Sequence, residues 1–556
     1  MSAERRKRIT ALMLCFLVTS LILIFRLAWL QLVQAKELAQ IATYHHTRTV
    51  FLDWGHGNSG RGQITDRNLA PLTGAQPRSG LAVFTQVGRV EETEADFNSW
   101  LNWLESRTGL DTETIIERSR NRQPLPLVAP LAPQIELPHW IKPVTWDWDD
   151  ELNFRRYTYT SLACHVLGIV NDNAGLLGLE KSFDSFLSCQ RPAVAAFVTA
   201  GNQLIPGLGY REIGAEPPVL VTTLDLEIQR IVESVWNQYI DTGRVPPTGA
   251  LLVLDPNTGE ILAMASRPEI IGAEHHYNRA VRKSPNVPVL PPASVIKTLT
   301  AAVALEQDIN YLQARYTCTG SITYGANSFE CHQVHGELDL AGALSHSCNV
   351  YFAKLAVELG AEDLLKMAEG MGLGEPPPIE LPSFEVDAGQ LPTLADLSTE
   401  SGVVNHFALG GNKFETTPLQ VAVMMAAVAN GGYRVEPSLV LALDDEKPTP
   451  VTPRWTRVFT SSTARTVAQM LNQAVLNREN LYNLTAWPRA RELAAKTGTS
   501  DRLQPGNYEI RWNAGFFPVD SPRYVVVYMA EVPPGWLSVQ RERLLAELAH
   551  TILARE

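Results

Sequence analysis

The segment PPASVIKTLTAAVALEQ, residues 291–307, places a serine hydroxyl and a lysine amine one helical turn apart. Residues i and i+3 of a helix share a face, so the amine of Lys297 can reach the hydroxyl of Ser294. A neutral lysine can take the proton of the serine, provided that burial or a nearby cation lowers the pKa of the lysine. The alternative is a helix N-cap beside a solvated lysine, because S-x-x-K arises about once by chance in a chain of this length.

A second segment, SHSCNVYF, places a hydroxyl and a side-chain amide close together in a predicted tight turn, at Ser347 and Asn349. We interpret Cys348 between them as a small buried residue. Ser-x-Asn is even more common by chance than S-x-x-K, so this pair gains meaning only from the other motifs.

The third segment, AAKTGTSD, contains the single Lys-Thr-Gly sequence of the chain. It places the ammonium group of Lys496 and the hydroxyls of Thr497 and Thr499 along one extended stretch, where Gly498 allows a substrate backbone to approach closely. S-x-x-K, S-x-N and K-T-G, in this order, form the motif set of penicillin-binding proteins and serine β-lactamases. Together the three segments predict an acyl-transfer site.

The surrounding pattern predicts an antiparallel sheet with helices packed on it. Residues 248–266 consist of two apolar runs joined by a DPNTG turn, and residues 511–531 have a similar hairpin pattern. Residues 217–239 predict a strand followed by a helix, for which Asp225 is the expected N-cap.

The N-terminus predicts a membrane anchor. Residues 9–25 contain no charge and follow the basic segment ERRKR. The run is near the lower limit for crossing a bilayer, and the basic residues should stay in the cytoplasm, with the remainder of the chain outside. A cleaved signal peptide is the alternative, but no A-x-A-like site follows the apolar run.

Composition limits the possible partners. The 556 residues carry a formal net charge of −12. Nucleic-acid-binding proteins usually have a basic face, so we expect no nucleic acid as a partner.

The cysteines leave two alternatives open in the segment CTGSITYGANSFECHQVH. A disulfide between Cys318 and Cys331 is possible on the oxidising side of a membrane. A zinc site is the other alternative, but His332 and His335 are too close together for the usual finger spacing, so the sequence disfavours zinc.

As a whole, the chain resembles a class B penicillin-binding protein, a membrane-anchored peptidoglycan D,D-transpeptidase. RGQITDRN resembles the pedestal signature that separates this class from β-lactamases, while GALLVLDPNTGEILAMAS and TTPLQVAVMMAAVANGG resemble parts of the transpeptidase domain. The resemblance implies an α+β fold with a mainly β pedestal and a transpeptidase domain whose antiparallel sheet is flanked by helices. The implied parts are a cytoplasmic tail at 1–8, a transmembrane anchor at 9–33, a pedestal at 34–215 and a transpeptidase domain at 216–556.

The resemblance also implies a mechanism for the first two motifs. Ser294 would attack the carbonyl between the two terminal D-alanines of a donor stem peptide, with Lys297 as the base. Ser347 and Asn349 would relay protons and hold the peptide. An amine from a neighbouring strand would then resolve the acyl-enzyme, and no metal or cofactor is expected.

In the third motif, the resemblance implies that Lys496 supplies positive potential and that Thr497 and Thr499 bind the terminal carboxylate. The backbone amides of Ser294 and Thr499 would form the oxyanion hole. The chain departs from the family at Ala293 and Ala495, where glycine is usual. These alanines could narrow the cleft or alter β-lactam affinity, but no reacting group is lost.

Other interpretations are a β-lactam sensor or β-lactamase-like protein, a catalytically silent cell-wall scaffold, and a D,D-carboxypeptidase. The pedestal signature and the complete set of reacting groups disfavour the first two. Because the segments before residue 217 resemble a pedestal rather than a glycosyltransferase, the resemblance implies a polytopic partner, a glycan polymerase of the shape, elongation, division and sporulation family. It places the protein in the bacterial cell membrane as a single-pass protein with an extracytoplasmic catalytic domain.

Overall fold

The computed structural model describes most of the chain. The described residues are 3–32, 48–51, 61–73, 78–121, 123, 125–129, 131, 135–138, 140–146, 162–171, 174–188, 193–198, 210–213, 218–270, 278–283, 289–411, 413–444, 454–503, 506–536 and 539–555.

The chain forms two compact units that interleave along the sequence. The first comprises Met1–Ser59, Pro77–Trp148 and Gln190–Glu216, and the second comprises Gly60–Gln76, Asp149–Cys189 and Pro217–Glu556. The sequence analysis instead set one boundary between residues 215 and 216. Two segments that it assigned to the pedestal belong to the second unit by their contacts.

Those two segments are fixed by strand pairing and by ion pairs. Strand β2 (Gln63–Thr65) pairs in parallel with β10 (Val219–Thr222). The guanidinium of Arg61 lies 2.7 Å from the Glu180 carboxylate and 2.9 Å from that of Asp184, and Arg61 and Glu180 are both buried. The RGQITDRN signature therefore acts as part of the second unit.

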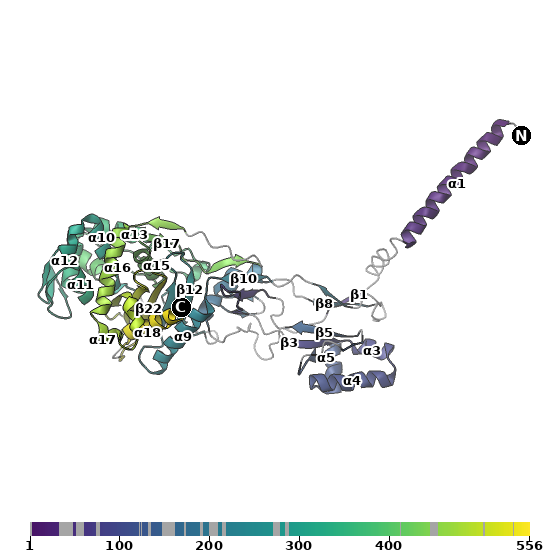
Figure 1. The fold of residues 1–556 in the computed structure, drawn as a ribbon, viewed down its shortest axis with the longest axis horizontal. Coiled ribbons are helices and arrows are strands. Elements are labelled where there is room, and N and C mark those ends of the chain that lie inside the picture. The colour runs from purple at the N-terminus through teal and green to yellow at the C-terminus, as the bar shows by residue number, and fades with distance from the viewer. Residues whose placement is uncertain are drawn as a thin grey trace. The chain divides into compact units, whose positions relative to one another are not determined.

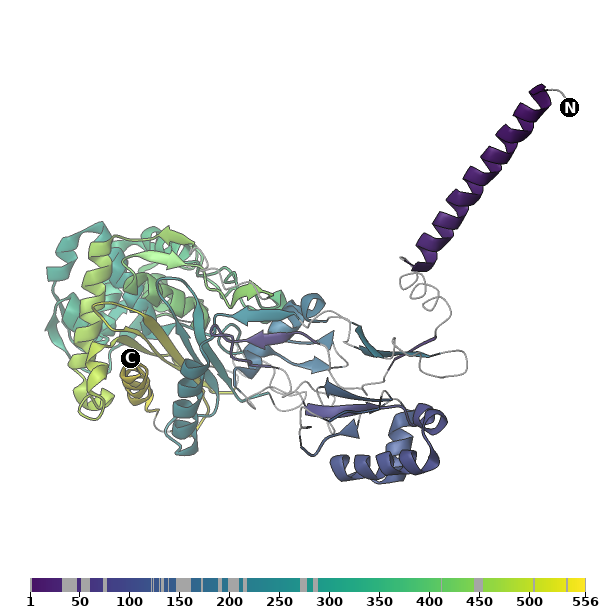
Figure 2. The same cartoon turned by 45° about the vertical axis from the view of Figure 1, so that its right-hand side comes forward.

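The first unit begins with one long helix. Helix α1 (Ala3–Leu32) is continuous and includes both the basic cluster and the apolar run (Figure 2). Its segment Leu12–Trp29 has a mean hydropathy of 2.3 and is long and apolar enough to cross a membrane, by length and composition.

Among the residues that the structure describes, the rest of the first unit contains two small sheets and three helices. In one sheet, β3 lies between β4 and β5, so the two ends of the proline-rich stretch near residues 123–143 contribute the edge strands. Helix α4 begins at an N-cap, Thr93, whose side chain accepts from the amide of Asp96, and ends at Gly109 in the left-handed region. The bounds are β1 (Arg48–Phe51), β3 (Arg78–Val83), α3 (Thr85–Glu91), α4 (Glu94–Thr108), α5 (Thr112–Arg120), β4 (Leu125–Pro126), β5 (Ile141–Trp146), β8 (Ala193–Val198) and β9 (Tyr210–Ile213).

The second unit is built around a five-stranded antiparallel sheet in the order β12-β11-β22-β21-β20. Both hairpins predicted from the sequence lie in it. The strands are β11 (Gly249–Leu254), β12 (Ile261–Arg267), β20 (Ala494–Thr499), β21 (Glu509–Phe517) and β22 (Tyr524–Val532).

Helices cover both faces of this sheet, and the strands alternate accordingly. In β11, Leu251 and Val253 face a core shared with α9 (Leu226–Asp241) and α18 (Arg541–Ala554), which pack together (Figure 1). Leu252, in the same strand, faces the larger core on the opposite side. The carboxylate of Asp225 accepts from the amides of Glu227 and Ile228, which confirms it as the N-cap of α9.

The larger core contains the helices that carry the first two motifs. Helix α15 (Pro418–Ala429) packs directly on the sheet, and nearly all of its residues are buried, so it is a core helix. The elements around it are η1 (Ala293–Ile296), α10 (Lys297–Gln307), η2 (Ile309–Gln313), α11 (Leu340–His346), α12 (Asn349–Leu359), α13 (Ala361–Gly370), η4 (Val403–Ala408), α16 (Ser461–Leu476) and α17 (Glu479–Tyr482).

Short elements complete the second unit. Strand β13 pairs with β16, β14 with β15, and β17 with β19, while β18 is the third strand beside β10. Their bounds are α6 (Cys164–Leu167), β6 (Val170–Asn171), β7 (Ala174–Gly175), α7 (Gly178–Ser182), α8 (Asp184–Leu187), β13 (Tyr316–Cys318), β14 (Ser321–Tyr324), β15 (Asn327–Glu330), β16 (Gly336–Leu338), η3 (Ser383–Glu385), α14 (Glu400–Gly402), β17 (Tyr433–Val435), β18 (Val440–Leu443), β19 (Trp455–Arg457) and η5 (Pro488–Glu492). The predicted α+β class, with an antiparallel sheet flanked by helices, is confirmed.

Candidate active site

Ser294 lies in the short 3-10 turn η1, directly before α10, and is half-buried. The preceding residue, Ala293, has φ +50°, in the left-handed region that favours glycine, and its amide donates to the carbonyl of Gly410 over 3.2 Å. Gly410 itself has φ +64°, and a Cβ there would lie 2.5 Å from the Ala293 oxygen. Backbone packing around Ala293 therefore fixes the position of the serine.

Strand β20 packs closely against the same turn. A Cβ on Gly498 would lie 3.0 Å from Val295 Cγ2 and 3.1 Å from the Pro292 oxygen. The indole nitrogen of Trp512, on β21, donates to the Pro291 carbonyl over 2.9 Å. The two atoms nearest to this Cβ position belong to the serine turn, and the third belongs to Trp512. The approach of a substrate backbone to Gly498 stays a prediction.

Lys297 is the first residue of α10 and is completely buried. Its Nζ donates to the Ser347 carbonyl over 2.8 Å and to Asn349 Oδ1 over 2.6 Å. Burial lowers the pKa of Lys297 to about 7, although the nearby Cys331 and Cys348 groups act in the opposite direction. The sequence analysis required such a lowered pKa for a lysine base.

The second motif forms a turn between two helices, as predicted. Ser347 ends α11 with φ +54°, and Cys348 is the N-cap of α12, where its sulfur accepts from the Tyr351 amide at 3.4 Å. The Asn349 side chain donates from Nδ2 to the Glu330 carbonyl over 2.8 Å. These contacts orient Asn349 Oδ1 toward the amine of Lys297.

Lys496 lies on β20 and is also buried. Its Nζ donates to Ser347 Oγ over 2.8 Å and to the Thr497 carbonyl over 2.7 Å. Ser347 therefore contacts both lysines, one through its carbonyl and one through its hydroxyl oxygen. Burial, followed by the positive charge of Lys297, holds the pKa of Lys496 well below its usual value.

Two arginines that the sequence analysis missed extend this positive region. Arg541, at the start of α18, donates to the Gly498 carbonyl and, over 3.0 Å, to Thr499 Oγ1. Arg478 Nη1 lies 3.5 Å from Thr497 Oγ1. Neither arginine belongs to a recognisable motif, because the fold alone brings them to β20. The hydroxyls and cations along β20 together suit a carboxylate.

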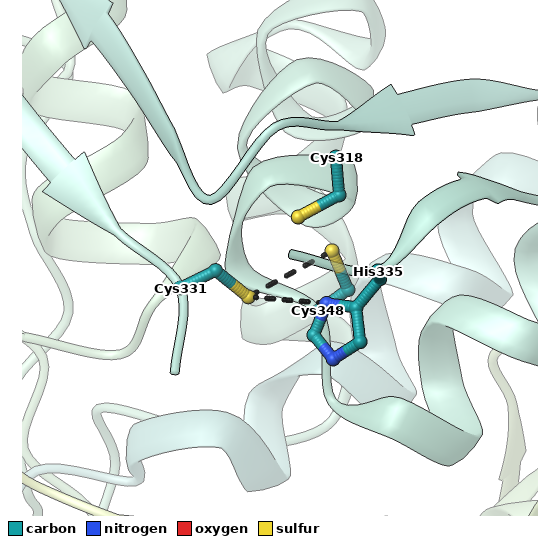
Figure 3. Close-up of side chains that lie close together, drawn as sticks. All are labelled: Cys318, Cys331, His335 and Cys348. Atoms are coloured by element: carbon teal, nitrogen blue, oxygen red, sulfur yellow. Dashed lines mark hydrogen bonds between the residues drawn. The ribbon is translucent and has the colours of Figure 1, made fainter. Parts of the chain in front are cut away.

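The cysteine-containing segment also converges near the second motif. Cys318, Cys331, His335 and Cys348 approach one another so closely that their candidate ligand atoms all lie within 4.8 Å (Figure 3). Cys318 and Cys331 are free thiols in the structure, so the disulfide considered in the sequence analysis is not formed there.

Residues 249–554, which contain all three motifs, match the family model for the penicillin binding protein transpeptidase domain. The chain belongs to this family. Among curated proteins, this penicillin-binding protein is 26% identical to stage V sporulation protein D of Bacillus subtilis, over 95% of this chain and 82% of that protein. It is also 26% identical to the peptidoglycan D,D-transpeptidase FtsI of Escherichia coli, over 93% of this chain and 86% of that protein.

Among solved structures, penicillin binding protein 3 of Mycobacterium tuberculosis, complexed with aztreonam, has a similar fold. It has a TM-score of 0.63 and 24% identity over 89% of this chain and 96% of that chain. Because the similarity to the curated relatives reaches well beyond the transpeptidase domain, the predicted class B relationship is confirmed.

Proposed function

We propose that this penicillin-binding protein is a serine D,D-transpeptidase that cross-links peptidoglycan stem peptides through an acyl-enzyme on Ser294. The observation that carries the proposal is the continuous contact between the three motifs. Lys297 of the first motif binds Ser347 and Asn349 of the second, and Ser347 binds Lys496 of the third, with distances of 2.6–2.8 Å.

In the first step, Lys297 acts as the base. A neutral amine has two hydrogens and one lone pair, and the two hydrogens are directed at the Ser347 carbonyl and Asn349 Oδ1. The lone pair is then available for the hydroxyl proton of Ser294, one helical turn away. Ser294 Oγ attacks the carbonyl between the terminal D-alanines, the C–N bond breaks, and D-alanine leaves after its nitrogen receives a proton through the Ser347 hydroxyl.

Strand β20 would hold the donor peptide and stabilise the developing charge. The backbone amides of Ser294 and Thr499 are the proposed oxyanion hole. Thr497 and Thr499 are the proposed ligands of the terminal carboxylate, supported by the positive charge of Arg478 and Arg541 and by the amine of Lys496, whose proposed role is to supply positive potential when it is protonated.

In the second step, the amine of a neighbouring stem peptide attacks the acyl-enzyme and releases Ser294 with a new amide bond. A β-lactam would enter by the same acylation, but its opened ring remains attached to the acyl group, which obstructs the amine. The aztreonam complex of the structurally similar protein supports this assignment.

The N-terminal helix supports a single-pass membrane location. Residues 1–8 would form the cytoplasmic tail and residues 9–33 the anchor, with the catalytic unit outside the bacterial cell membrane. A reporter fused after Val33 should be active only if it functions outside the cytoplasm. Activity of a reporter that requires the cytoplasm would contradict this topology.

The proposed partner is a polytopic glycan polymerase of the shape, elongation, division and sporulation family. Support comes from the similarity to relatives across the segments before the transpeptidase domain, where the sequence resembles a pedestal. The purified chain alone should therefore make no glycan from labelled lipid II. Glycan chains made without a partner, and insensitive to penicillin, would contradict a class B role.

The test of the proposed function is a reconstituted cross-linking assay with lipid II, such a polymerase, and the full-length chain. Cross-linked muropeptides should appear with the unmodified chain and disappear with Ser294→Ala or with penicillin, while uncross-linked glycan continues to form. Release of D-alanine without cross-links would instead identify a D,D-carboxypeptidase. Cross-links formed by Ser294→Ala would refute the assignment of the nucleophile.

A further inference from the structure

Four potential metal ligands meet beside the second catalytic motif, although they come from four separate segments. Cys318 ends β13, Cys331 follows β15, His335 precedes β16, and Cys348 caps α12. Figure 3 shows the three sulfurs and the His335 ring directed at one common point. All four candidate ligand atoms lie within 4.8 Å of one another.

Two of the separations match those of a tetrahedral zinc site. With Zn–S bonds of about 2.3 Å and a Zn–N bond of about 2.0–2.1 Å, tetrahedral geometry requires S···S separations of about 3.8 Å and S···N separations of about 3.5 Å. The Cys331 and Cys348 sulfurs are 3.9 Å apart, and Cys331 Sγ lies 3.5 Å from His335 Nδ1. Two thiols at 3.9 Å are not bonded, because an S–S bond is about 2.05 Å long.

Backbone amides donate hydrogen bonds to two of the sulfurs. The amide of Asn349 donates to Cys331 Sγ over 3.3 Å, and the amide of Tyr351 donates to Cys348 Sγ over 3.4 Å. Cys348 also lies at the N-terminus of α12, where the helix dipole stabilises negative charge. Backbone N–H donors to the ligand sulfurs are a common outer shell of thiolate metal sites.

We propose that Cys318, Cys331, His335 and Cys348 bind one structural zinc ion. Three thiolates and an imidazole form a closed Cys₃His set, which suits zinc and leaves no open position for catalysis. Three thiolates packed this closely would repel one another without a cation, and zinc leaves the set with one net negative charge. Cys331 and His335 are half-exposed and provide the route of entry for the ion.

The sequence analysis disfavoured zinc because it compared His332 and His335 with a finger pattern. The proposed set uses only His335, and it takes its fourth ligand from Cys348, which the sequence analysis interpreted as a small buried residue. The separation of these residues along the chain gives no recognisable spacing.

The zinc would act as a positioning element for the catalytic turn. Cys348 lies between Ser347 and Asn349, the two residues that contact the catalytic lysines. An ion at this point would connect the turn to β13, the end of β15 and the segment before β16. The turn would then keep its geometry while substrate enters and leaves.

The first experiment measures the metal content of the full-length chain, purified in detergent under reducing conditions without added chelator. About one zinc per chain is expected. Cys331→Ser and Cys348→Ser should lose the zinc, and Cys348→Ser keeps a hydroxyl that can still cap α12. The matched control is Cys164→Ser, because Cys164 is a free cysteine outside the cluster and its loss should leave the zinc content unchanged.

A second measurement does not depend on whether the variants fold. Zinc removed from the unmodified chain by a chelator should be replaceable by cobalt, with the thiolate-to-cobalt charge-transfer and intense visible bands of a tetrahedral sulfur-rich site. Cys164→Ser should give the same spectrum. Ser294→Ala should keep its zinc while losing acylation, so failure of the zinc proposal and failure of the proposed function are distinguishable.

The proposal is overturned if the reduced chain contains no zinc and takes up none. It is equally overturned if another metal fills the site in the purified chain, or if peptide mapping of the chain as purified from cells finds a disulfide between two of the three cysteines.

Discussion

The two turns that carry the serine and the Ser-x-Asn motif are held in place by different means. The turn at residues 291–297 is fixed by backbone contacts, since Gly410 and Gly498 allow other segments to lie directly against it. The turn at residues 347–349 is fixed by side chains, through Lys297, Lys496 and the sulfur cluster around Cys348. The first turn should therefore be sensitive to added atoms, and the second to the loss of a polar group or sulfur.

The two turns also have different roles: one sets the position of Ser294, and the other sets the surroundings of the Lys297 amine. The serine turn determines where Ser294, the proposed nucleophile, lies, whereas the contacts of the second turn surround Lys297, the proposed base. Lys297 is buried without an anionic partner at hydrogen-bond distance among the described contacts, and its two acceptors are the neutral groups of Ser347 and Asn349. Neutral acceptors solvate the amine without holding its extra proton strongly, which fits a pKa of about 7.

The largest effect should follow from removing the amine of Lys297 while keeping the volume of its side chain. Lys297→Met should slow acylation by penicillin about 10²–10⁴-fold, because the proton acceptor for Ser294 is lost. The second-order acylation rate with a fluorescent penicillin is the measurement. The control is Lys366→Met, which removes an exposed lysine of α13 and should leave the rate unchanged. Equal rates for both variants would remove Lys297 from the mechanism.

The next largest effect, on both stability and acylation, should follow from adding one methyl group against the serine turn. Gly410→Ala should destabilise the chain by at least about 2 kcal/mol and slow acylation, because it adds a clash with Ala293 to left-handed backbone strain. Gly325→Ala is the matched control, with φ +60° and no atom within 4 Å of the new Cβ. It should cost about 1–2 kcal/mol at most and leave acylation intact. Thermal unfolding and acylation rates of both variants are the measurements. Equal losses in the two variants would show that left-handed backbone strain, rather than the clash with Ala293, causes the effect.

The acylation rate should depend on pH through the protonation of Lys297. Lys297 is the base only when neutral, so the rate should rise with pH and reach half its plateau near pH 7, with about a tenfold increase between pH 6 and pH 8. Folding should be checked over the same range. A rate that is constant, or that falls as pH rises from 6 to 8, would contradict a neutral lysine base; Lys297→Met should lack the inflection.

The smallest effects should distinguish the two alanines that replace the usual glycines. Ala293→Gly relieves left-handed strain of about 1–2 kcal/mol but increases the entropy of the unfolded chain, so a net stabilisation of up to about 1 kcal/mol is expected. Ala495 is the second residue of β20 and is buried, so Ala495→Gly should destabilise the chain by about 1 kcal/mol. Unfolding measurements that give both changes the same sign would contradict this account of the serine turn.

The sequence was most informative where structure is local. The hairpins around residues 248–266 and 511–531, the N-cap Asp225 and the turn at Ser347 all depend on short patterns, and the structure has each of them. The three motifs were recognisable together because each keeps its reacting groups within a few residues.

Other features depend on segments that meet only after folding. Arg541 reaches β20 from the start of α18, and the sulfur cluster draws on four segments between residues 318 and 348. The RGQITDRN segment joins the second unit through Arg61, whose partner Glu180 lies far along the chain. No local periodicity or spacing encodes such contacts, so they could not be predicted from the residues alone.

The most direct test of the central claim is to locate the acyl group. The full-length chain would be incubated with penicillin, digested, and mapped by mass spectrometry. The account predicts a single penicilloyl group on Ser294, in the peptide that contains residues 291–297, and none in Ser294→Ala. An acyl group on another residue, or labelling of folded Ser294→Ala at the unmodified rate, would contradict it.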